Sequence, residues 1–213
     1  MTLQDAAVTA VLADGTEVEL RPVGPDDKPL LKQGMAMLSP ASRRLRFMSP
    51  IENLSRSQLA YLTEIDHESH FAWGVMVAGQ PVAIGRLVRL TGSPKVAEIA
   101  ITVVDDWQGR GVGTLLVQVL AEIGRSVDIE RVSFEALPEN EGIVRLLGRF
   151  GATHAFGDGI VSGSLEISSI EPVAFRSGSI LELAAAARRY GTGPEPADAQ
   201  PSTARTKRGT NSA

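Results

Sequence analysis

The chain has 213 residues, 43% of them hydrophobic and 22% charged, and a formal net charge of −4, a composition typical of a globular domain. It contains no cysteine, which excludes disulfides, thiolate zinc sites and a cysteine nucleophile, and its negative charge argues against broad binding to nucleic acid. No apolar run approaches the roughly 18 residues of a membrane helix and the start lacks the layout of a signal peptide, so we expect a cytoplasmic protein without membrane contacts.

The first third of the chain is predicted to form a β-hairpin followed by short helices. Apolar and polar residues alternate over residues 8–23, around the turn signal Asp14-Gly15. A first helix is expected to start at Gly24-Pro25. Two further helices are expected over residues 41–48 and 55–65, and Ser55 or Ser57 is expected to cap the last one.

The middle of the chain is predicted to be a three-stranded meander followed by alternating helices and strands. The meander strands are expected at 71–77, 81–90 and 96–104. Helices are then expected at 112–125 and 139–150, and strands at 131–137, 152–157 and 160–167. This order predicts a mixed α/β fold, an α+β mixed sheet in which some strands are parallel. A last helix is expected over 179–190, and residues 191–213 lack apolar periodicity and are expected to be disordered.

The segment DWQGRGVG, residues 106–113, places three glycines at alternate positions between a predicted strand and a predicted helix. Its spacing fails the dinucleotide-binding fingerprint, and no Lys-Ser/Thr pair follows it as a P-loop requires. Glycines at such density let backbone N–H groups converge at a helix N-terminus, a nest that favours a pyrophosphate. The side chain of Arg110 could add positive charge there or point to solvent.

The glycine segment belongs to a longer pattern, Val103-x4-Gln108-x2-Gly111-x-Gly113, which resembles the acyl-CoA signature of the GNAT superfamily of N-acyltransferases. The segment LPENEGIVRLLGRFGA is similar to the second conserved helix of that family. The resemblance implies the GNAT acyl-CoA N-acyltransferase fold, with splayed central strands and acetyl-CoA as the acyl donor.

The segments LSPASRRLRFMSP, LTEIDHESHFAW and AEIAITVVDDWQGRGVG narrow the resemblance to bacterial protein lysine acetyltransferases of the Pat type. Several members of that group carry a regulatory domain, such as a cyclic-nucleotide-binding one, for which we expect no room in this chain. The expected organisation is an N-terminal extension with the start of the hairpin over 1–17, the acetyltransferase domain over 18–170, a C-terminal strand and helix extension over 171–190, and a tail over 191–213.

The resemblance also implies which residues hold acetyl-CoA. The backbone of Ala100, Ile101 and Thr102 would pair with the amides of the pantetheine arm as a pseudo-strand. The pyrophosphate would be held by the segment Gln108, Gly109, Arg110, Gly111, Val112 and Gly113. Asn140 matches an asparagine that contacts the pantetheine arm in many relatives, but an asparagine at ENEG is also suited to cap the following helix.

Glu98 is the candidate general base. Residues 96–104 are apolar on both faces of a strand apart from this carboxylate, which predicts a central, buried strand. Burial would raise the pKa of the carboxyl toward neutrality, which suits a base acting on an ammonium group. The structural alternative is an ion pair with Arg86 or Arg89. The resemblance independently implies a catalytic glutamate in this strand.

Two further positions bear on the chemistry. Glu135, on the next predicted strand, is the second candidate for the base, since some ribosomal-protein acetyltransferases place theirs there; the alternative is a solvated or paired carboxylate. Many relatives also carry a tyrosine seven residues after the asparagine, to protonate the leaving thiolate. Leu147 occupies that position here, and the chain's tyrosines are Tyr61 and Tyr190. Water or another group would then protonate the leaving thiolate.

Two clusters outside these motifs have modest signals. His67 and His70 could bind a metal with Asp66 or Glu68 as a third ligand, but nothing else supports a metal site and none is expected. His70 could instead adjoin the active site or be a hydrogen-bonded histidine at the end of a strand. Three arginines, Arg43, Arg44 and Arg46, predict a solvated helix face or a contact with the CoA 3′-phosphate or a protein substrate. Lys207 could be a self-acetylation site or part of an inert tail.

These features together predict an acetyl-CoA-dependent N-acetyltransferase that acts on lysine ε-amino groups of proteins, with Glu98 as general base. Direct transfer is expected because no cysteine could carry the acetyl group. One alternative keeps the chemistry but changes the acceptor to a small amine. Another is a catalytically silent acyl-CoA-binding sensor or partner module. The sequence leaves the oligomeric state open.

Overall fold

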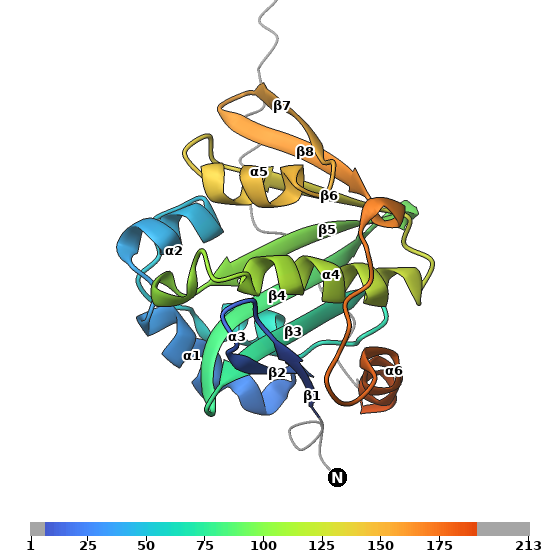
Figure 1. The fold of residues 1–213 in the computed structure, drawn as a ribbon. Coiled ribbons are helices and arrows are strands. Elements are labelled where there is room, and N and C mark those ends of the chain that lie inside the picture. Colours follow the sequence, from blue (N-terminus) through green and yellow to red (C-terminus); the bar gives the residue numbers. More distant parts are fainter. Residues whose placement is uncertain (1–6, 191–213) are drawn as a thin grey trace, which may run out of the picture.

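The computed structural model describes residues 7–190, so the expected tail and Lys207 lie outside the described residues. Eight strands form one sheet in the order β1-β2-β3-β4-β5-β6-β8-β7 (Figure 1). The strands are β1 Val8–Val11, β2 Glu17–Pro22, β3 His70–Val77, β4 Gln80–Leu90, β5 Ser93–Val103, β6 Arg131–Ala136, β7 Thr153–Gly157 and β8 Ile160–Glu166. This open mixed sheet confirms the predicted fold class.

Six α-helices and three short 3₁₀ helices connect these strands. The α-helices are α1 Lys28–Ala36, α2 Pro40–Phe47, α3 Arg56–Thr63, α4 Val112–Arg125, α5 Glu141–Gly148 and α6 Ile180–Tyr190. The 3₁₀ helices are η1 Pro25–Asp27, η2 Asp105–Trp107 and η3 Ile167–Ser169. The predicted helices and strands before residue 171 are present, with ends that differ by a few residues, as is the helix expected over 179–190. The strand expected in the extension over 171–190 is wrong: only an isolated bridge between Thr9 and Ser177 forms there. None of the helices in residues 7–190 is both long and apolar enough to cross a membrane.

The sheet is antiparallel except between β5 and β6, which pair in parallel over a short stretch. Their register runs from Val96 opposite Arg131 to Glu98 opposite Ser133, where the pairing stops. Beyond Glu98 the two strands diverge, and β5 continues to pair only with β4. The backbone of β5 facing away from β4 therefore lacks a strand partner after Glu98, and its polar groups remain open to a ligand. This opening is the predicted splay.

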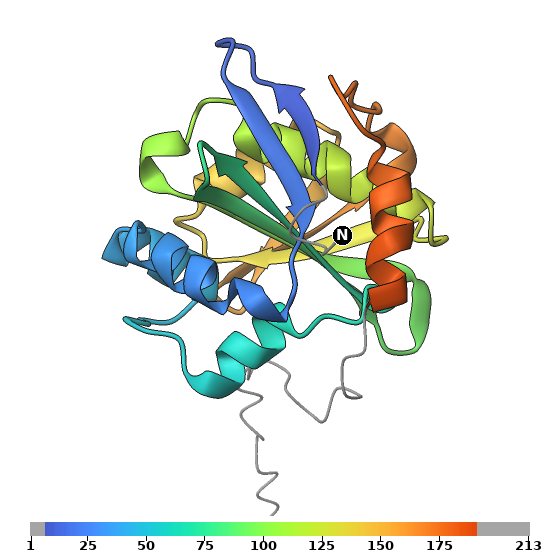
Figure 2. The ribbon, with the colours of Figure 1, turned by 90° about the horizontal axis from the view of Figure 1, so that it is seen from below.

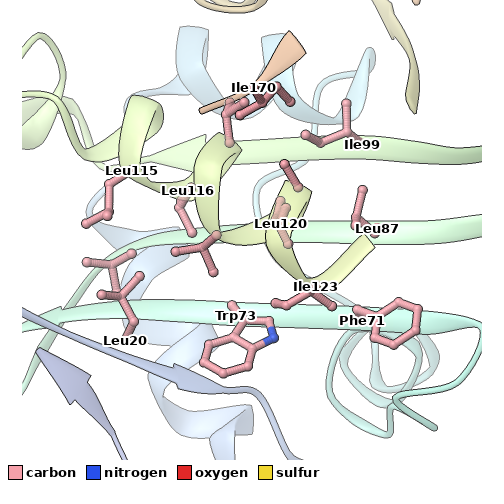
Figure 3. Packing of buried hydrophobic residues seen from close by; sticks show 14 of the residues in the cluster. Leu20, Phe71, Trp73, Leu87, Ile99, Leu115, Leu116, Leu120, Ile123 and Ile170 are labelled. Atoms are coloured by element: carbon pink, nitrogen blue, oxygen red, sulfur yellow. The ribbon is translucent and has the colours of Figure 1, made fainter. Parts of the chain in front are cut away.

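The helices cover the two faces of the sheet unequally (Figures 1 and 2). Helix α4 packs on one face against β3, β4 and β5, while α1, α2 and α3 lie on the opposite face. The core between α4 and the sheet includes Leu116 and Leu120 from the helix and Trp73 and Leu87 from the strands (Figure 3). These side chains are at most 1% exposed, and burying each one stabilises the fold by about 1.5–3 kcal/mol. The same core fixes the position of the α4 N-terminus.

The short helices on the other face are held by local capping and by long-range contacts, one of which involves the start of α2. Ser55, and not Ser57, caps α3: its Oγ accepts from Gln58 N at 3.1 Å and the Gln58 side chain returns to Ser55 N. Helix α2 is capped by Ser39, whose own backbone N donates to Asp105 Oδ2 at 2.9 Å. Because Asp105 follows β5, this bond ties the start of α2 to the loop that precedes α4.

Candidate active site

A long cleft of about 660 Å³ runs between α2, the loop after β5 and the N-terminal ends of α4 and α5, a volume typical of ligand sites. Its lining includes Ser42, Leu45 and Arg46 from α2; Ile101, Thr102 and Val103 from β5; Trp107, Gln108, Gly109, Gly111, Gly113 and Thr114 from the loop and α4; and Glu139, Asn140, Ile143, Arg145, Leu146 and Arg149 around α5. The cleft thus brings together most of the predicted acyl-CoA residues. Ala100, Arg110 and Val112 do not line it.

The glycines of the loop have two different physical roles. Gly109 and Gly111 have φ angles of +75° and +92°, which side-chain-bearing residues rarely adopt, and Gly111 is the N-cap of α4. Gly113 instead allows close packing, since a Cβ there would lie 3.0 Å from Leu146 Cδ2. Because these glycines line the cleft, the cleft extends to the start of α4.

The start of α4 has the properties of an anion site. The N–H groups of Val112, Gly113 and Thr114 belong to the first turn, where no preceding helical carbonyl can accept from them. The helix dipole adds partial positive charge at the same place. Gly113 and Thr114 line the cleft, whereas the Val112 side chain is buried in the core and only its backbone is available. This geometry suits a phosphate or pyrophosphate group.

Arg110 neither adds its charge to the nest nor points to solvent, the two roles that we expected for it. Its Nη2 donates to Asp14 Oδ2 at 2.7 Å and to Thr16 Oγ1 at 3.0 Å, and its Nε donates to the same Asp14 oxygen at 3.0 Å. The guanidinium also lies 4.0 Å from the ring centroid of Trp107. The side chain therefore neither enters the nest nor points freely to solvent; it fastens the glycine loop to the β1–β2 hairpin.

Gln108 and Asn140 use their side chains to shape the cleft. Gln108 Nε2 donates to Val103 O and Asp105 Oδ1, each at 3.1 Å, which closes the turn between β5 and the glycines. Asn140 Oδ1 accepts from Ile143 N at 3.3 Å, so the expected capping role is present. The cap uses only the oxygen of the amide, and the nitrogen remains available to a ligand in the cleft.

Glu98 lies on the face of the sheet that α1–α3 cover, but beyond the area they enclose. The prediction that β5 is buried on both faces is wrong here: Ala97 and Ile99 are buried against α4, whereas the Glu98 side chain is exposed. The helices on this face stop short of the β5–β6 junction, which leaves the carboxylate accessible. Partial burial still raises the pKa of the Glu98 carboxyl, Glu135 raises it further, and Arg46 opposes the shift.

The two arginines that the sequence offers as ion-pair partners for Glu98 have other partners. Arg86 is buried, and its Nη1 meets His70 Nε2 at 3.0 Å while its Nη2 donates to Leu62 O at 2.5 Å. Arg89 points to the other face of the sheet and donates to Val127 O at 2.8 Å. No ion pair within the described residues engages Glu98, so its carboxylate is free to accept a proton from a bound amine.

The arginine cluster of α2 divides among three neighbours. Arg43 Nη1 donates to Glu52 O at 2.9 Å and Arg44 pairs with Glu139 at 3.3 Å, whereas Arg46 lines the cleft and is close enough to Glu98 to affect its pKa. The simple solvated face expected for this helix is therefore wrong for Arg46. Glu135, the second candidate for the base, is exposed on β6.

The two histidines have structural partners. His67 is buried and its Nε2 lies 3.2 Å from Val23 O, and burial lowers the pKa of its imidazole. Burial, together with the charge of Arg86, lowers the pKa of His70 to about 3, so this ring is neutral at physiological pH. Across residues 7–190, no group of three or more metal-ligating side chains is found.

Sequence reasoning missed part of the cleft. Arg145 of α5 and Arg149, the C-cap of that helix, line it, and their spacing of four residues after the N-cap Asn140 is the available signal. Tyr61 of α3 does not line the cleft, and its ring lies 5.1 Å from that of His70. Leu147 is fully buried in the core, so nothing at that position can donate a proton to a ligand.

Comparison with known proteins gives a consistent result. Residues 40–152 match the acetyltransferase (GNAT) family. Acetyltransferase Pat of Mycolicibacterium smegmatis is 31% identical over 173 residues, which are 80% of this chain and 52% of the relative. An acetyltransferase of Pseudomonas aeruginosa is 31% identical over 118 residues, 54% of this chain and 63% of that protein. The chain thus spans about half the length of the first relative.

A solved structure agrees with these relatives. The crystal structure of the GNAT domain of S. lividans PAT superposes with a TM-score of 0.72 at 29% sequence identity, covering 75% of this chain and 96% of that domain.

Proposed function

Because the chain belongs to the acetyltransferase (GNAT) family, we propose that it transfers the acetyl group of acetyl-CoA to an amine nitrogen, with lysine ε-amino groups of proteins as acceptors. The observation that carries the proposal is the position of Glu98. It is an accessible, unpaired carboxylate with a raised pKa, at the residue where β5 and β6 part and within reach of the charge of the cleft residue Arg46.

The cleft fits acetyl-CoA as the donor. The N–H groups of Gly113 and its neighbours at the α4 N-terminus suit the pyrophosphate. The unpaired backbone edge of β5 over Ala100, Ile101 and Thr102 suits the amides of the pantetheine arm, and Asn140 faces the same space. A donor with its pyrophosphate at Gly113 and its arm along β5 would direct its thioester toward Glu98.

The residues present support direct transfer. Glu98 would take a proton from the acceptor ammonium, and the free amine would attack the thioester carbonyl carbon. A C–N bond forms, the C–S bond breaks and CoA leaves as a thiolate. The chain holds no cysteine that could form an acyl-thioester intermediate. The raised pKa of the Glu98 carboxyl is closer to the pKa of the acceptor ammonium group, which improves proton transfer between them.

A protein-borne lysine is favoured as acceptor by the openness of this face. Glu98 and Glu135 are both exposed, on the neighbouring strands β5 and β6. Such a surface can receive a side chain projecting from a large partner, and its two carboxylates attract a cationic group. The sequence resemblance to Pat-type lysine acetyltransferases points to the same acceptor. A small polyamine would meet the same carboxylates and is the second candidate.

The test measures thiol release from acetyl-CoA with three acceptors: a cell extract, a lysine-containing peptide and spermine. We expect transfer to protein lysines, identified by labelled acetyl groups. Glu98→Gln should reduce kcat by about 10²-fold or more, while calorimetry shows unchanged CoA affinity. Glu130→Gln is the matched control, since this exposed glutamate pairs with Lys95 away from the cleft and should leave kcat unchanged.

Other results would contradict specific parts of the proposal. Full activity in Glu98→Gln, with a large loss in Glu135→Gln, would transfer the base to Glu135. Transfer only to spermine would replace the protein acceptor by a small amine. Tight CoA binding without thiol release toward any acceptor would identify an acyl-CoA sensor and overturn the enzymatic function.

A further inference from the structure

The two edges of the sheet differ in how they are covered. At the β1 edge, Thr9 N donates to Ser177 O at 3.2 Å and Arg176 N donates to Thr9 O at 2.8 Å, so a later segment of the chain covers part of that edge. At the other edge, β7 pairs only with β8, and no further backbone hydrogen bond from the described residues reaches it (Figure 1). The outer backbone groups of β7 are therefore open to another strand.

Strand β7 lacks the features that usually keep an edge strand from pairing. Its sequence, Thr-His-Ala-Phe-Gly, contains no lysine, no acidic residue and no proline. Its register with β8 runs without a shift from Thr153 to Gly157, so no bulge twists the edge away. All five residues are exposed, and Phe156, at 69%, is the most exposed large hydrophobic side chain among the described residues. Such an edge favours pairing with a further strand.

The register also assigns the β7 side chains to the two faces of the sheet. Phe156 lies opposite Val161, which is buried, and His154 lies two residues before it, so both point to the face that carries the core. Thr153 and Ala155 point to the opposite face. The aromatic side chains of β7 thus share one face of an open edge.

A second copy of β7 fits this edge in one antiparallel register. All five residues of each strand have a counterpart only when Ala155 stands opposite Ala155 of the second copy. His154 then stands opposite Phe156 of the second copy, and this pair occurs twice. Opposed side chains of antiparallel strands point to the same side with their Cβ atoms about 4.5–5.5 Å apart. Each histidine ring can therefore pack on a phenylalanine ring and cover the exposed side chain.

A second copy of the chain is the occupant that these features favour. Two-fold pairing satisfies both β7 edges at once and leaves neither of them open, so the assembly closes at two chains. Because the β1 edge is partly covered at Thr9, head-to-tail addition of further chains is disfavoured. The strand brings no carboxylate to the junction, so the net charge of −4 on each chain opposes association only at longer range, where salt screens it.

We propose that the chain forms a homodimer through its β7 strands, with a two-fold axis at Ala155. The dimer does not depend on the proposed acetyl transfer, because none of residues 153–157 lines the cleft.

Light scattering coupled to size-exclusion chromatography, over a dilution series, measures the molar mass. We expect a dimer, and we expect Phe156→Lys and His154→Glu each to produce a monomer. The two substitutions combined in one chain should restore the dimer, because their opposite charges face each other across the junction. Leu181→Lys is the matched control: it introduces the same charge at an exposed apolar residue of α6 and should leave the dimer intact.

A crosslinking measurement tests the register. The chain contains no cysteine, so Ala155→Cys introduces a single thiol at the two-fold axis. Opposed Cα atoms of antiparallel strands are about 4.5–5.5 Å apart, which is within the range that a disulfide spans. Mild oxidation should therefore crosslink Ala155→Cys into a covalent dimer. Ala185→Cys, exposed on α6, should stay uncrosslinked under the same conditions.

Several results would overturn the dimer. A monomer at every concentration, with no crosslink in Ala155→Cys, would exclude it, and a dimer that persists in Phe156→Lys would place the interface elsewhere. A monomer in which Phe156→Lys raises the KM for a protein acceptor but not for spermine would assign the β7 edge to the acceptor protein. Circular dichroism checks that each variant is folded, and Ala155→Cys decides the question if Phe156→Lys does not fold.

Discussion

Arg110 shows how one side chain couples two distant segments of the molecule. It stands in the glycine loop, but its guanidinium binds Asp14 and Thr16 of the β1–β2 hairpin and stacks on Trp107. A hydrogen bond from Thr16 N and the contact with Arg110 lower the pKa of Asp14 to about 2, so its carboxylate is charged throughout the physiological range. The contact holds the backbone of the loop in the curvature that the nest needs.

Removing the partner of Arg110 tests this role. We expect Asp14→Asn to weaken CoA binding by about two- to fivefold, the range of an exposed ion pair, with kcat at saturating acetyl-CoA unchanged. Calorimetry with CoA provides the measurement. Glu17→Gln is the control because it breaks another exposed hairpin ion pair, with Arg176, that does not contact the loop. Tighter binding in Asp14→Asn would mean that Asp14 competes with the pyrophosphate for Arg110.

The environment of Glu98 makes a signed prediction about pH. A general base must be deprotonated, so kcat/KM should fall as the pH drops through the raised pKa of Glu98. Glu135→Gln removes a negative neighbour, lowers that pKa and should move the acidic limb to lower pH. Arg46→Gln removes a positive neighbour and should move the limb to higher pH. Both variants leaving the limb in place would show that another group titrates.

At the scale of elements, the short helices matter because they carry cleft residues to one place. Helix α2 brings Arg46 to the cleft and is tied to the loop after β5 through Ser39 and Asp105. Helix α3 contributes no residue to the cleft and is fixed by its capping box and by the bond from Arg86 to Leu62 O. Neither helix exceeds eight residues, so these tertiary contacts, rather than helix propensity, stabilise them.

The glycine loop offers a test of its backbone conformation. Gly111→Ala should place a side chain at a φ of +92°, at a cost of about 1–2 kcal/mol, and should abolish measurable CoA binding as the loop changes shape. Gly92→Ala is the control: it has a φ of +80°, equally open surroundings and a place in the β4–β5 turn. It should lower the melting temperature by a similar amount without affecting CoA affinity. Equal CoA affinities in the two variants would contradict the nest.

For the whole molecule, the packing of α4 on the sheet is the feature on which the site depends. A Cβ on Gly85 of β4 would lie 2.9 Å from Leu120 Cδ1, so the helix rests directly on the strand backbone. This contact sets the height of the α4 N-terminus above β5, and with it the width of the cleft.

Leu120→Ala tests that packing. Leu120 is fully buried, and its truncation should destabilise the protein by about 2–5 kcal/mol and lower Tm by several degrees. The control Leu181→Ala removes a side chain that is 41% exposed and should leave Tm within a degree or two. Chemical denaturation provides the free energies. An unchanged Tm in Leu120→Ala would show that α4 contributes little to the core.

Much of this architecture could be read from the sequence because its determinants are local. Asp14-Gly15 specifies a hairpin, Ser55 and Gln58 specify a helix start, and the glycines at 109, 111 and 113 specify a strand-to-helix turn with an open backbone. Each of these signals acts within a few residues, so the order of elements and most residues of the proposed acyl-CoA cleft could be predicted from them.

The tertiary structure decided what depends on distant partners. Alternation along β5 predicted a buried Glu98, but exposure depends on where α1–α3 end over the sheet. Arg110 binds a residue 96 positions away, and Arg86 of β4 joins His70 of β3 to Leu62 O of α3. Such pairings arise from the packing of whole elements, which no local pattern encodes. The sequence by itself therefore determined the residues of the proposed acyl-CoA site and its candidate base, and the packing of the helices on the sheet determined which charges surround that base.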